Sequence, residues 1–287
     1  MKPDSPTPFD PPASRAVSHD HWAAHASQWH KIGAPLRPGP DDVALMCRMV
    51  ERYVPGQARR GVLLGMTQEL WPLGDITGVD RDPAVVSKRK AQQGANGQEV
   101  LADWRDMPFE AGQFDFALGD GSFNNLRHPD EYRQVLAQLA RILKPGRPGL
   151  FRMFIRPDVA EAAADVVRLA QARQIQGFHA FKWRLAMALC SAQADPNIAV
   201  QAIHAAFQLL VPDRAHFAAA TGWAPDLIAT IDVYAGSSLD YSFPTLGEFR
   251  AALAGTCVEL ELAHGHYELA ERCPVIALRF GAAASQV

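Results

Sequence analysis

The sequence predicts an α/β fold: a doubly wound, seven-stranded mixed sheet in which five parallel strands precede a terminal antiparallel pair. Short apolar runs alternate with helical segments from residue 41 to residue 155. Short links between them are typical of a parallel sheet with helices on both faces. Alternating or apolar runs at residues 257–266 and 273–280, separated by a few polar residues, indicate the antiparallel pair.

The elements of the sheet follow in a regular order. Five strands are expected at residues 61–65, 75–80, 98–103, 114–120 and 149–155. Helices are expected at residues 41–54, 83–93, 129–143 and 245–255, and another should begin after Thr67, a plausible N-cap. Residues 1–17 contain five prolines among their first twelve positions and are expected to be disordered. Residues 18–30 are expected to form a short amphipathic helix.

The pattern changes after Pro157. Residues 157–243 are rich in alanine and show helical spacing with few strand signals. Helices are expected at 158–175, 179–193, 196–210 and 213–230, the last broken near Gly222. The predicted organisation is therefore an α/β core of residues 18–156 and 244–287, with a helical insertion after the fifth strand.

Composition limits the classes of function. The 287 residues carry a net charge of −3, with 48% hydrophobic residues, which suits a cytoplasmic globular protein. No basic excess favours nucleic acid as a partner. No apolar run approaches the roughly 18 residues of a membrane span, so no membrane partner is expected. The four cysteines are far apart and form no CxxC pair, which indicates reduced thiols.

Carboxylates end two of the predicted strands. Asp80 closes DITGVD, Asp103 closes QEVLAD, and the run GVLLG ends in a turn at Gly65. Parallel α/β sheets bind nucleotides at the carboxyl ends of their strands. A strand-end aspartate can also serve only as a helix cap or turn former. A binding role and a purely structural role therefore both stay open for each carboxylate.

Several segments together resemble the class I S-adenosylmethionine-dependent methyltransferases. ARILKPGRPGLFRMF is similar to the helix–KPGG–strand signature of that family, and FDFALGDGSFNNL to its fourth-strand motif. LLGMTQEL resembles a variant of its first motif, accompanied upstream by a W…PLRP segment that begins at Trp29. The resemblance implies a Rossmann-like sheet, S-adenosylmethionine as cofactor and a small-molecule methyl acceptor. It also implies that the helical insertion acts as a lid that selects the acceptor. A homo-oligomer is possible.

The resemblance also assigns roles to residues. Asp80 would hold the ribose hydroxyls, Asp103 would accept from the adenine amine, and Arg37 would pair with the methionine carboxylate. A solvated linker arginine remains the alternative for Arg37. The full cofactor-binding set is Gly65, Met66, Thr67, Asp80, Arg81, Asp103, Trp104, Asp120, Gly121 and Arg37. The candidate acceptor contacts are Trp29, Ser122, His179, Tyr234 and Tyr241.

The first motif departs from the family pattern because it keeps a single glycine at the turn. Either the methionine part is held differently or the site has lost its ligand. Two other hypotheses therefore stay open: a non-catalytic nucleoside-binding or interaction module, and a nicotinamide-dependent oxidoreductase, although GxGxxG is absent. No metal is expected, since the histidines at 19, 21, 25, 30, 264 and 266 lack HExxH or cysteine partners. No catalytic base is identified, and methyl transfer to a nucleophilic acceptor does not require one.

Overall fold

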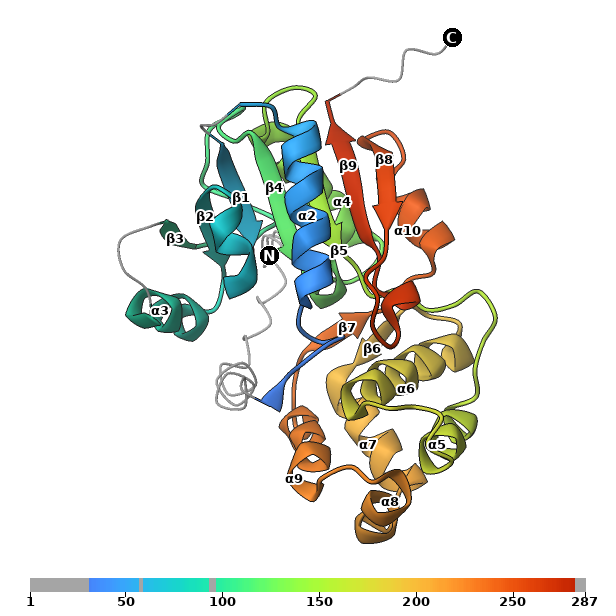
Figure 1. Cartoon of the computed structure of the whole chain (residues 1–287). Coiled ribbons are helices and arrows are strands. Elements are labelled where there is room, and N and C mark those ends of the chain that lie inside the picture. The colour runs from blue at the N-terminus through green and yellow to red at the C-terminus, as the bar shows by residue number, and fades with distance from the viewer. Residues whose placement is uncertain (1–30, 57–58, 93–96, 282–287) are drawn as a thin grey trace, which may run out of the picture.

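Seven strands form one sheet of order β3-β2-β1-β4-β5-β9-β8 (Figure 1). This computed structural model describes residues 31–56, 59–92 and 97–281. The expected disordered segment 1–17, the expected helix 18–30 and Trp29 lie outside the described residues. The strands are β1 (Arg60–Leu64), β2 (Asp75–Asp80), β3 (Gln98–Leu101), β4 (Phe116–Asp120), β5 (Pro148–Arg152), β8 (Cys257–Ala263) and β9 (Val275–Phe280).

The pairing of the strands confirms the predicted fold class. β1 pairs in parallel with β2 and β4, β2 with β3, and β4 with β5. β9 then runs antiparallel to both β5 and β8, which closes the sheet. The buried strands read as continuous apolar runs, as expected when both faces of a sheet are covered.

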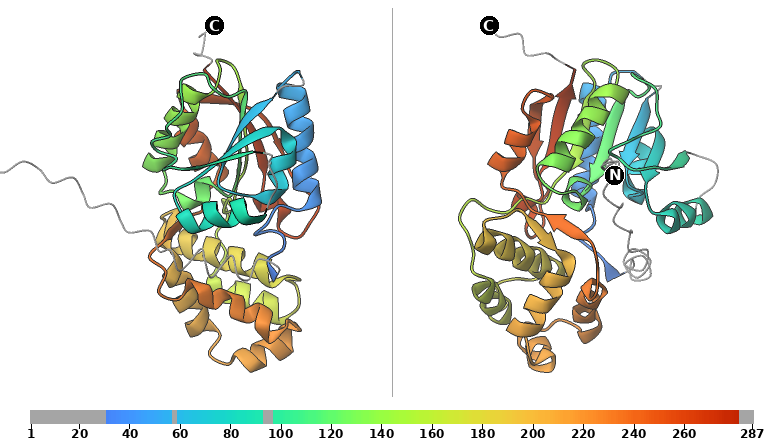
Figure 2. Two further views of the ribbon diagram at one scale, coloured as in Figure 1. Left: turned by 90° about the vertical axis from the view of Figure 1, so that its left-hand side faces the viewer. Right: turned by 180° about the vertical axis from the view of Figure 1, so that it is seen from behind.

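Helices cover the two faces of the sheet (Figures 1 and 2). α2 (Pro40–Tyr53) packs Met46, Met49 and Val50 against the face that carries Leu63 and Leu118. α4 (Asp130–Ile142) and α10 (Leu246–Leu253) pack against the opposite face, while α3 (Pro83–Gln92) lies beside β2 and β3. Alternate residues of each strand thus enter two separate cores.

The connection after β1 differs from the prediction of an α-helix. The chain forms a short 3-10 helix, η2 (Gln68–Leu73), and the Thr67 side chain makes no capping hydrogen bond. Pro72 lies inside this segment, where it removes a backbone donor, and Gly74 ends it. The tighter turn keeps Leu70 and Trp71 buried against the sheet.

Residues 163–242 form a helical unit at the carboxyl edge of the parallel strands (Figure 1). Its order is α5 (Ala163–Gln171), α6 (Phe178–Gln193), β6 (Asn197–Ala199), α7 (Val200–Leu210), α8 (Arg214–Thr221), α9 (Pro225–Ile228), η4 (Ala229–Tyr234) and β7 (Asp240–Ser242). The expected break falls at Gly222, which adopts φ +79°. The short antiparallel pair β6–β7 was not predicted, and α5 is shorter than the expected helix 158–175.

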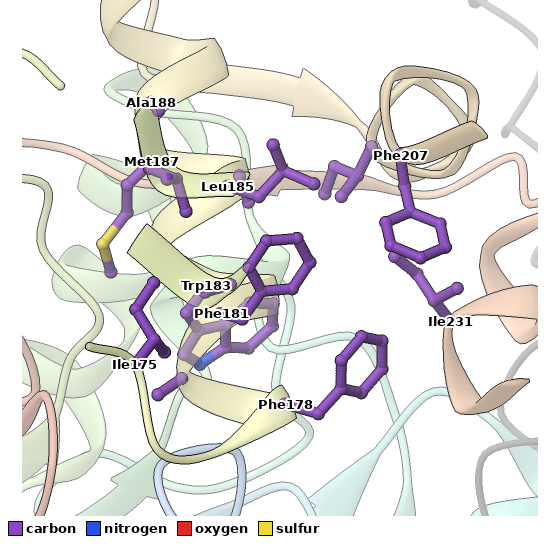
Figure 3. Close-up of a cluster of buried hydrophobic side chains, with 14 of the residues drawn as sticks. Ile175, Phe178, Phe181, Trp183, Leu185, Met187, Ala188, Phe207 and Ile231 are labelled. Atoms are coloured by element: carbon purple, nitrogen blue, oxygen red, sulfur yellow. The ribbon is translucent and has the colours of Figure 1, made fainter. Parts of the chain in front are cut away.

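α6 is the central helix of the helical unit. Its residues are buried on every side of the helix, and Phe178 and Phe181 meet Phe207 of α7 and Ile231 of η4 (Figure 3). A helix with buried residues on every side must be enclosed by other elements. One side of α6 therefore contacts the neighbouring helices, while another faces the sheet through the contact of Trp183 with Phe154.

Candidate active site

The carboxyl ends of the five parallel strands meet along one edge. Leu64 is in register with Val79 and Gly119, Asp80 with Leu101, and Asp120 with Arg152. The strand order reverses between β1 and β4, because β2 and β3 extend to one side and β5 to the other. Ligands of open α/β sheets bind at such a reversal. The edge above β1 and β4 is therefore the candidate site.

The turn after β1 is formed by Gly65, Met66 and Thr67. Gly65 has φ +100°, which an L side chain rarely adopts, and its amide donates to the carbonyl of Val79 at 2.8 Å. Trp104 Nε1 donates to the same carbonyl at 2.7 Å. A methyl group built on Gly78 would lie 2.8 Å from the sulfur of Met66, so Met66 packs over β2. The single glycine thus allows the tight turn after β1.

Asp80 lies at the end of β2, next to the Gly65 turn. Its Oδ1 accepts a 2.9 Å hydrogen bond from the amide of Asp82, and Asp82 in turn accepts from Ala84 at 2.8 Å at the start of α3. Burial raises the pKa of Asp80 to about 6, and the neighbouring Asp82 carboxylate adds to the rise. The negative charge of Asp80 is therefore poorly stabilised in the free protein. Further hydrogen-bond donors from a ligand would stabilise it.

Asp103 lies beyond β3 and is held by Arg105. The Arg105 guanidinium donates to Oδ1 at 2.9 Å and to Oδ2 at 2.6 Å, and the Arg105 amide also donates to Oδ1. Burial raises the pKa of Asp103, but these hydrogen bonds outweigh it and hold the pKa below its usual value. Arg81 Nη1 approaches Oδ2 at 3.9 Å, and Arg105 also pairs with Glu131 of α4. Asp103 is thus fixed and ionised near Asp80.

Asp120 ends β4 inside a buried group of charges that sequence analysis missed. Arg152, at the end of the neighbouring strand β5, donates from Nε to Asp120 Oδ1 at 2.5 Å. Its Nη1 donates to the carbonyl of Pro35 at 2.9 Å and to the Tyr267 hydroxyl at 3.1 Å, and lies 3.5 Å from Asp42 Oδ2. Arg152 and Asp42 are fully buried. Asp120 and Arg152 meet because they are in register on neighbouring strands, and neither segment of sequence carries a signal for that pairing.

The loop after β4 is held by backbone-directed side chains. Ser122 Oγ donates to the carbonyl of Leu64 at 2.7 Å, which ties this loop to the end of β1. Asn124 donates to the carbonyls of Phe154 and Ser242 at 2.7 and 2.6 Å and accepts from the Phe154 amide at 2.9 Å. Gly121 has φ +60°, and an added Cβ would lie 2.6 Å from the Phe154 ring. The loop therefore has one tightly defined conformation.

The segment before α2 reaches the same edge. Arg37 Nε pairs with Glu69 of η2, and the carbonyl of Pro35 accepts from Arg152. Glu69 Oε2 is buried and has no hydrogen-bond partner within the described part of the chain. Glu69 is also close enough to raise the pKa of Asp120, after the larger effect of burial. Arg37 and Glu69 thus place both signs of charge close to the turn after β1.

The expected acceptor contacts of the helical unit lie on three different elements. His179 is on α6, where its Nε2 bonds the carbonyl of Lys31 at 2.8 Å. Tyr234 ends η4 and Tyr241 lies in β7, with ring centroids 6.0 Å apart. Trp183 connects them to the edge, since its ring lies 5.6 Å from Tyr241 and 5.1 Å from Phe154. The helical unit is therefore in direct contact with the end of β5.

The described residues hold neither a metal-binding cluster nor a membrane-spanning helix. No group of three or more histidine, cysteine, aspartate or glutamate side chains there is arranged to hold a metal ion. No helix among residues 31–56, 59–92 and 97–281 is long and apolar enough to cross a membrane. The histidines at 19, 21, 25 and 30 fall outside the described residues.

Comparison with known proteins agrees with the geometry. Residues 60–146 match a family model described as a methyltransferase domain. A demethylmenaquinone methyltransferase of Staphylococcus aureus is 31% identical over 86 residues, which are 29% of this chain and 34% of that protein. The chain thus matches about a third of the length of such curated relatives.

Solved structures resemble the chain over most of its length. A 1,6-didemethyltoxoflavin-N1-methyltransferase of Burkholderia thailandensis, solved with S-adenosylhomocysteine, has a TM-score of 0.51 at 14% identity, covering 95% of this chain and 93% of that one. A Rhodobacter sphaeroides protein described as a putative zinc-dependent alcohol dehydrogenase has a TM-score of 0.59 at 14% identity, covering 93% and 99%. At such identities the likeness concerns the fold alone. Residues 60–146 thus match a methyltransferase domain, and the strand order and structural likeness show that the chain has the fold of the class I S-adenosylmethionine-dependent methyltransferases.

Proposed function

We propose that this protein is an S-adenosylmethionine-dependent methyltransferase that acts on a small molecule. The observation that carries the proposal is Asp80, a poorly compensated carboxylate beside the Gly65 turn at the strand-order reversal. A carboxylate in this place can accept from both hydroxyls of a ribose. The family match over residues 60–146 supports the same cofactor.

Neighbouring residues supply the remaining contacts of the proposal. Asp103, fixed by Arg105, faces the adenine end, with Arg81 and Trp104 beside it. At the other end, Arg37 and Glu69 offer opposite charges to the carboxylate and ammonium groups of the methionine part. The unpartnered Glu69 Oε2 supports this assignment. A charged pair thereby replaces the contacts that further glycines provide in the usual first motif.

The chemistry requires little of the protein beyond positioning. The bound cofactor supplies a methyl group already activated on a sulfonium. The loop from Asp120 to Asn125 holds the edge next to the reacting atoms in a fixed conformation, and the helical unit excludes water. Holding the acceptor atom in line with the methyl group can supply much of the rate acceleration.

The acceptor is proposed to be a compact ring system. The relatives described above act, by their names, on demethylmenaquinone and on 1,6-didemethyltoxoflavin. The buried contact between the helical unit and the chain that follows β5 is rich in aromatic rings, namely Phe154, Trp183, Tyr234, Tyr241 and Phe243. Flat aromatic acceptors pack favourably against such rings.

Calorimetry with S-adenosylhomocysteine tests the proposal. The wild-type chain should bind it, and Asp80→Ala should abolish detectable binding. Asp75→Ala is the matched control, because Asp75 begins the same strand at the opposite edge. Unchanged binding by Asp80→Ala would exclude this cofactor site. A thermal shift with NADH but not with S-adenosylhomocysteine would favour the oxidoreductase alternative, and no shift with either would favour a non-catalytic module.

A further inference from the structure

Three polar residues share one face of the buried helix α6. His179, Lys182 and Trp183 are spaced i, i+3 and i+4, which places them side by side. Their exposed fractions are only 6%, 1% and 5%. Polar groups at this depth normally have complete hydrogen-bond partners, and exceptions call for an explanation.

Lys182 is the most unusual member of this face. Its Nζ lies 5.2 Å from the centre of the Tyr234 ring and 5.6 Å from that of Phe178, and donates to Thr230 Oγ1 at 3.4 Å. No carboxylate in the described part of the chain lies within ion-pair distance of this amine. A buried ammonium without a counter-ion is costly, so burial lowers the pKa of Lys182 to about 7.

Other polar atoms on this face also lack partners. His179 Nδ1 and Trp183 Nε1 are buried, and neither has a hydrogen-bond partner among the described residues. The Tyr241 ring packs against both Trp183, at 5.6 Å, and Tyr234, at 6.0 Å. Lys182, Trp183, Tyr234 and Tyr241 are neighbours and are here named the lysine–tyrosine cluster; within the described residues, its Lys182 amine has no carboxylate partner and its Trp183 Nε1 has no acceptor.

The cluster adjoins the edge where the cofactor is proposed to bind. Trp183 contacts Phe154, whose ring lies against Gly121 in the loop after β4. On the other side, His179 bonds to Lys31, just before the segment that carries Arg37. The cluster is therefore the part of the helical unit that is linked to the methyl-transfer edge, through the contact of Trp183 with Phe154.

We propose that the lysine–tyrosine cluster binds the methyl acceptor through an ionised hydroxyl, so that the substrate class is an aromatic or enolic ring with an acidic OH. Lys182 pairs with the oxyanion, and the rings of Trp183 and Tyr241 pack against the acceptor. This inference rests on the proposed methyltransferase function and deepens it by naming the acceptor class.

The proton balance of this binding mode is simple. The neutral amine of Lys182 takes the proton of the acceptor hydroxyl, which gives an ammonium–oxyanion pair. When the anion attacks the methyl group, the new bond to the acceptor forms, the sulfur–methyl bond breaks, and the sulfonium becomes a neutral thioether. The ammonium then has no counter-ion and releases its proton to water.

Binding of 4-nitrophenol, whose ionised form has its own visible absorbance, tests the inference on the full chain saturated with S-adenosylhomocysteine. At a pH below the pKa of the free phenol, the bound probe should absorb as the phenolate. Lys182→Met should weaken probe binding by about 10- to 100-fold, the range of one lost charge-assisted hydrogen bond. Methionine fills similar volume without a charge, so the variant should fold.

Two controls separate the possible outcomes. 4-Nitroanisole cannot ionise and should bind wild type and Lys182→Met equally. Lys144→Met removes a lysine that pairs with Asp115 at the opposite edge and should leave probe binding unchanged. Binding of the probe as neutral phenol, no binding, or equal affinity in Lys182→Met would overturn the inference. Retained S-adenosylhomocysteine binding in Lys182→Met shows that such a failure concerns the acceptor and leaves the proposed cofactor site standing.

Discussion

Asp80 ends β2 with a carboxylate whose pKa burial raises to about 6 from the ordinary value of 3.8. In the free protein, Asp80 therefore becomes protonated as the pH falls below about 6. Ribose hydroxyls donate efficiently only to its ionised form. Binding below this pH must first remove the proton. We expect the affinity for S-adenosylhomocysteine to fall by up to about tenfold per pH unit as the pH drops from about 6.

Calorimetric titrations across about pH 4.5 to 7, a range that spans the pKa of about 6 of Asp80, measure this dependence. Asp80→Asn keeps one acceptor oxygen but cannot ionise, so its weaker binding should show a flatter profile. Asp103 should contribute no slope in this window, because Arg105 keeps its pKa below the usual value. A slope of equal size in Asp80→Asn would assign the dependence to another group.

Individual residues also show which parts of the candidate site could be predicted from the sequence. That Asp80, Asp103 and Asp120 would gather at one edge followed from their places at strand ends, and the structure brings all three there. Their partners were not predictable. Arg152 follows Asp120 by 32 positions and reaches it only because β4 and β5 pair in that register. In the sequence, nothing distinguishes Lys182 from an exposed lysine of an alanine-rich helix. Its burial on all sides depends on tertiary packing, which the local sequence does not reveal.

At the scale of elements, the alternating pattern of strands and helices was sufficient to predict the sheet. In each core strand, apolar side chains point to both faces of the sheet. This pattern can be read from the local sequence. The 3-10 form of η2 and the pair β6–β7 escaped prediction for a different reason. Both are short, and their hydrogen bonds depend on contacts that the local sequence does not encode, such as Val200 bonding the carbonyl of Leu239.

The loop after β4 gives a prediction at this scale. Gly121→Ala should lower the free energy of unfolding by about 2–4 kcal/mol, since alanine at φ +60° costs about 1–2 kcal/mol and its Cβ would overlap the Phe154 ring. Gly236→Ala is the matched control, because Gly236 has φ +68° with no atom within 4 Å of an added Cβ. Urea denaturation of both variants isolates the packing term. Equal destabilisation would show that the Phe154 contact contributes nothing.

For the whole molecule, the helical unit is tied to the α/β core on two sides. Asn124 and Tyr132 hold β7 through Ser242, the latter by a 2.8 Å bond between hydroxyls. On the other side, Glu161 pairs with both Arg184 of α6 and Arg272 of the core. We expect these ties to hold the helical unit as a fixed wall of the proposed site, in place of the lid that the resemblance implies. Access to the edge would then depend on the segment that contains Pro35 and Arg37.

The contact of Glu268 with the start of α6 tests this picture of a fixed wall. Both carboxylate oxygens of Glu268, in the core loop after β8, accept from backbone amides of Gln176 and Gly177 at 2.7 Å. These amides lie at the positive end of α6, where a carboxylate stabilises the helix. Glu268→Ala should therefore lower stability by about 1–3 kcal/mol and increase amide hydrogen exchange at the first turn of α6. Glu271→Ala, whose side chain is 69% exposed, should change stability by less than about 0.5 kcal/mol. If α6 moved as a free lid, exchange at its first turn would already be fast in the wild-type chain, and Glu268→Ala would leave it unchanged.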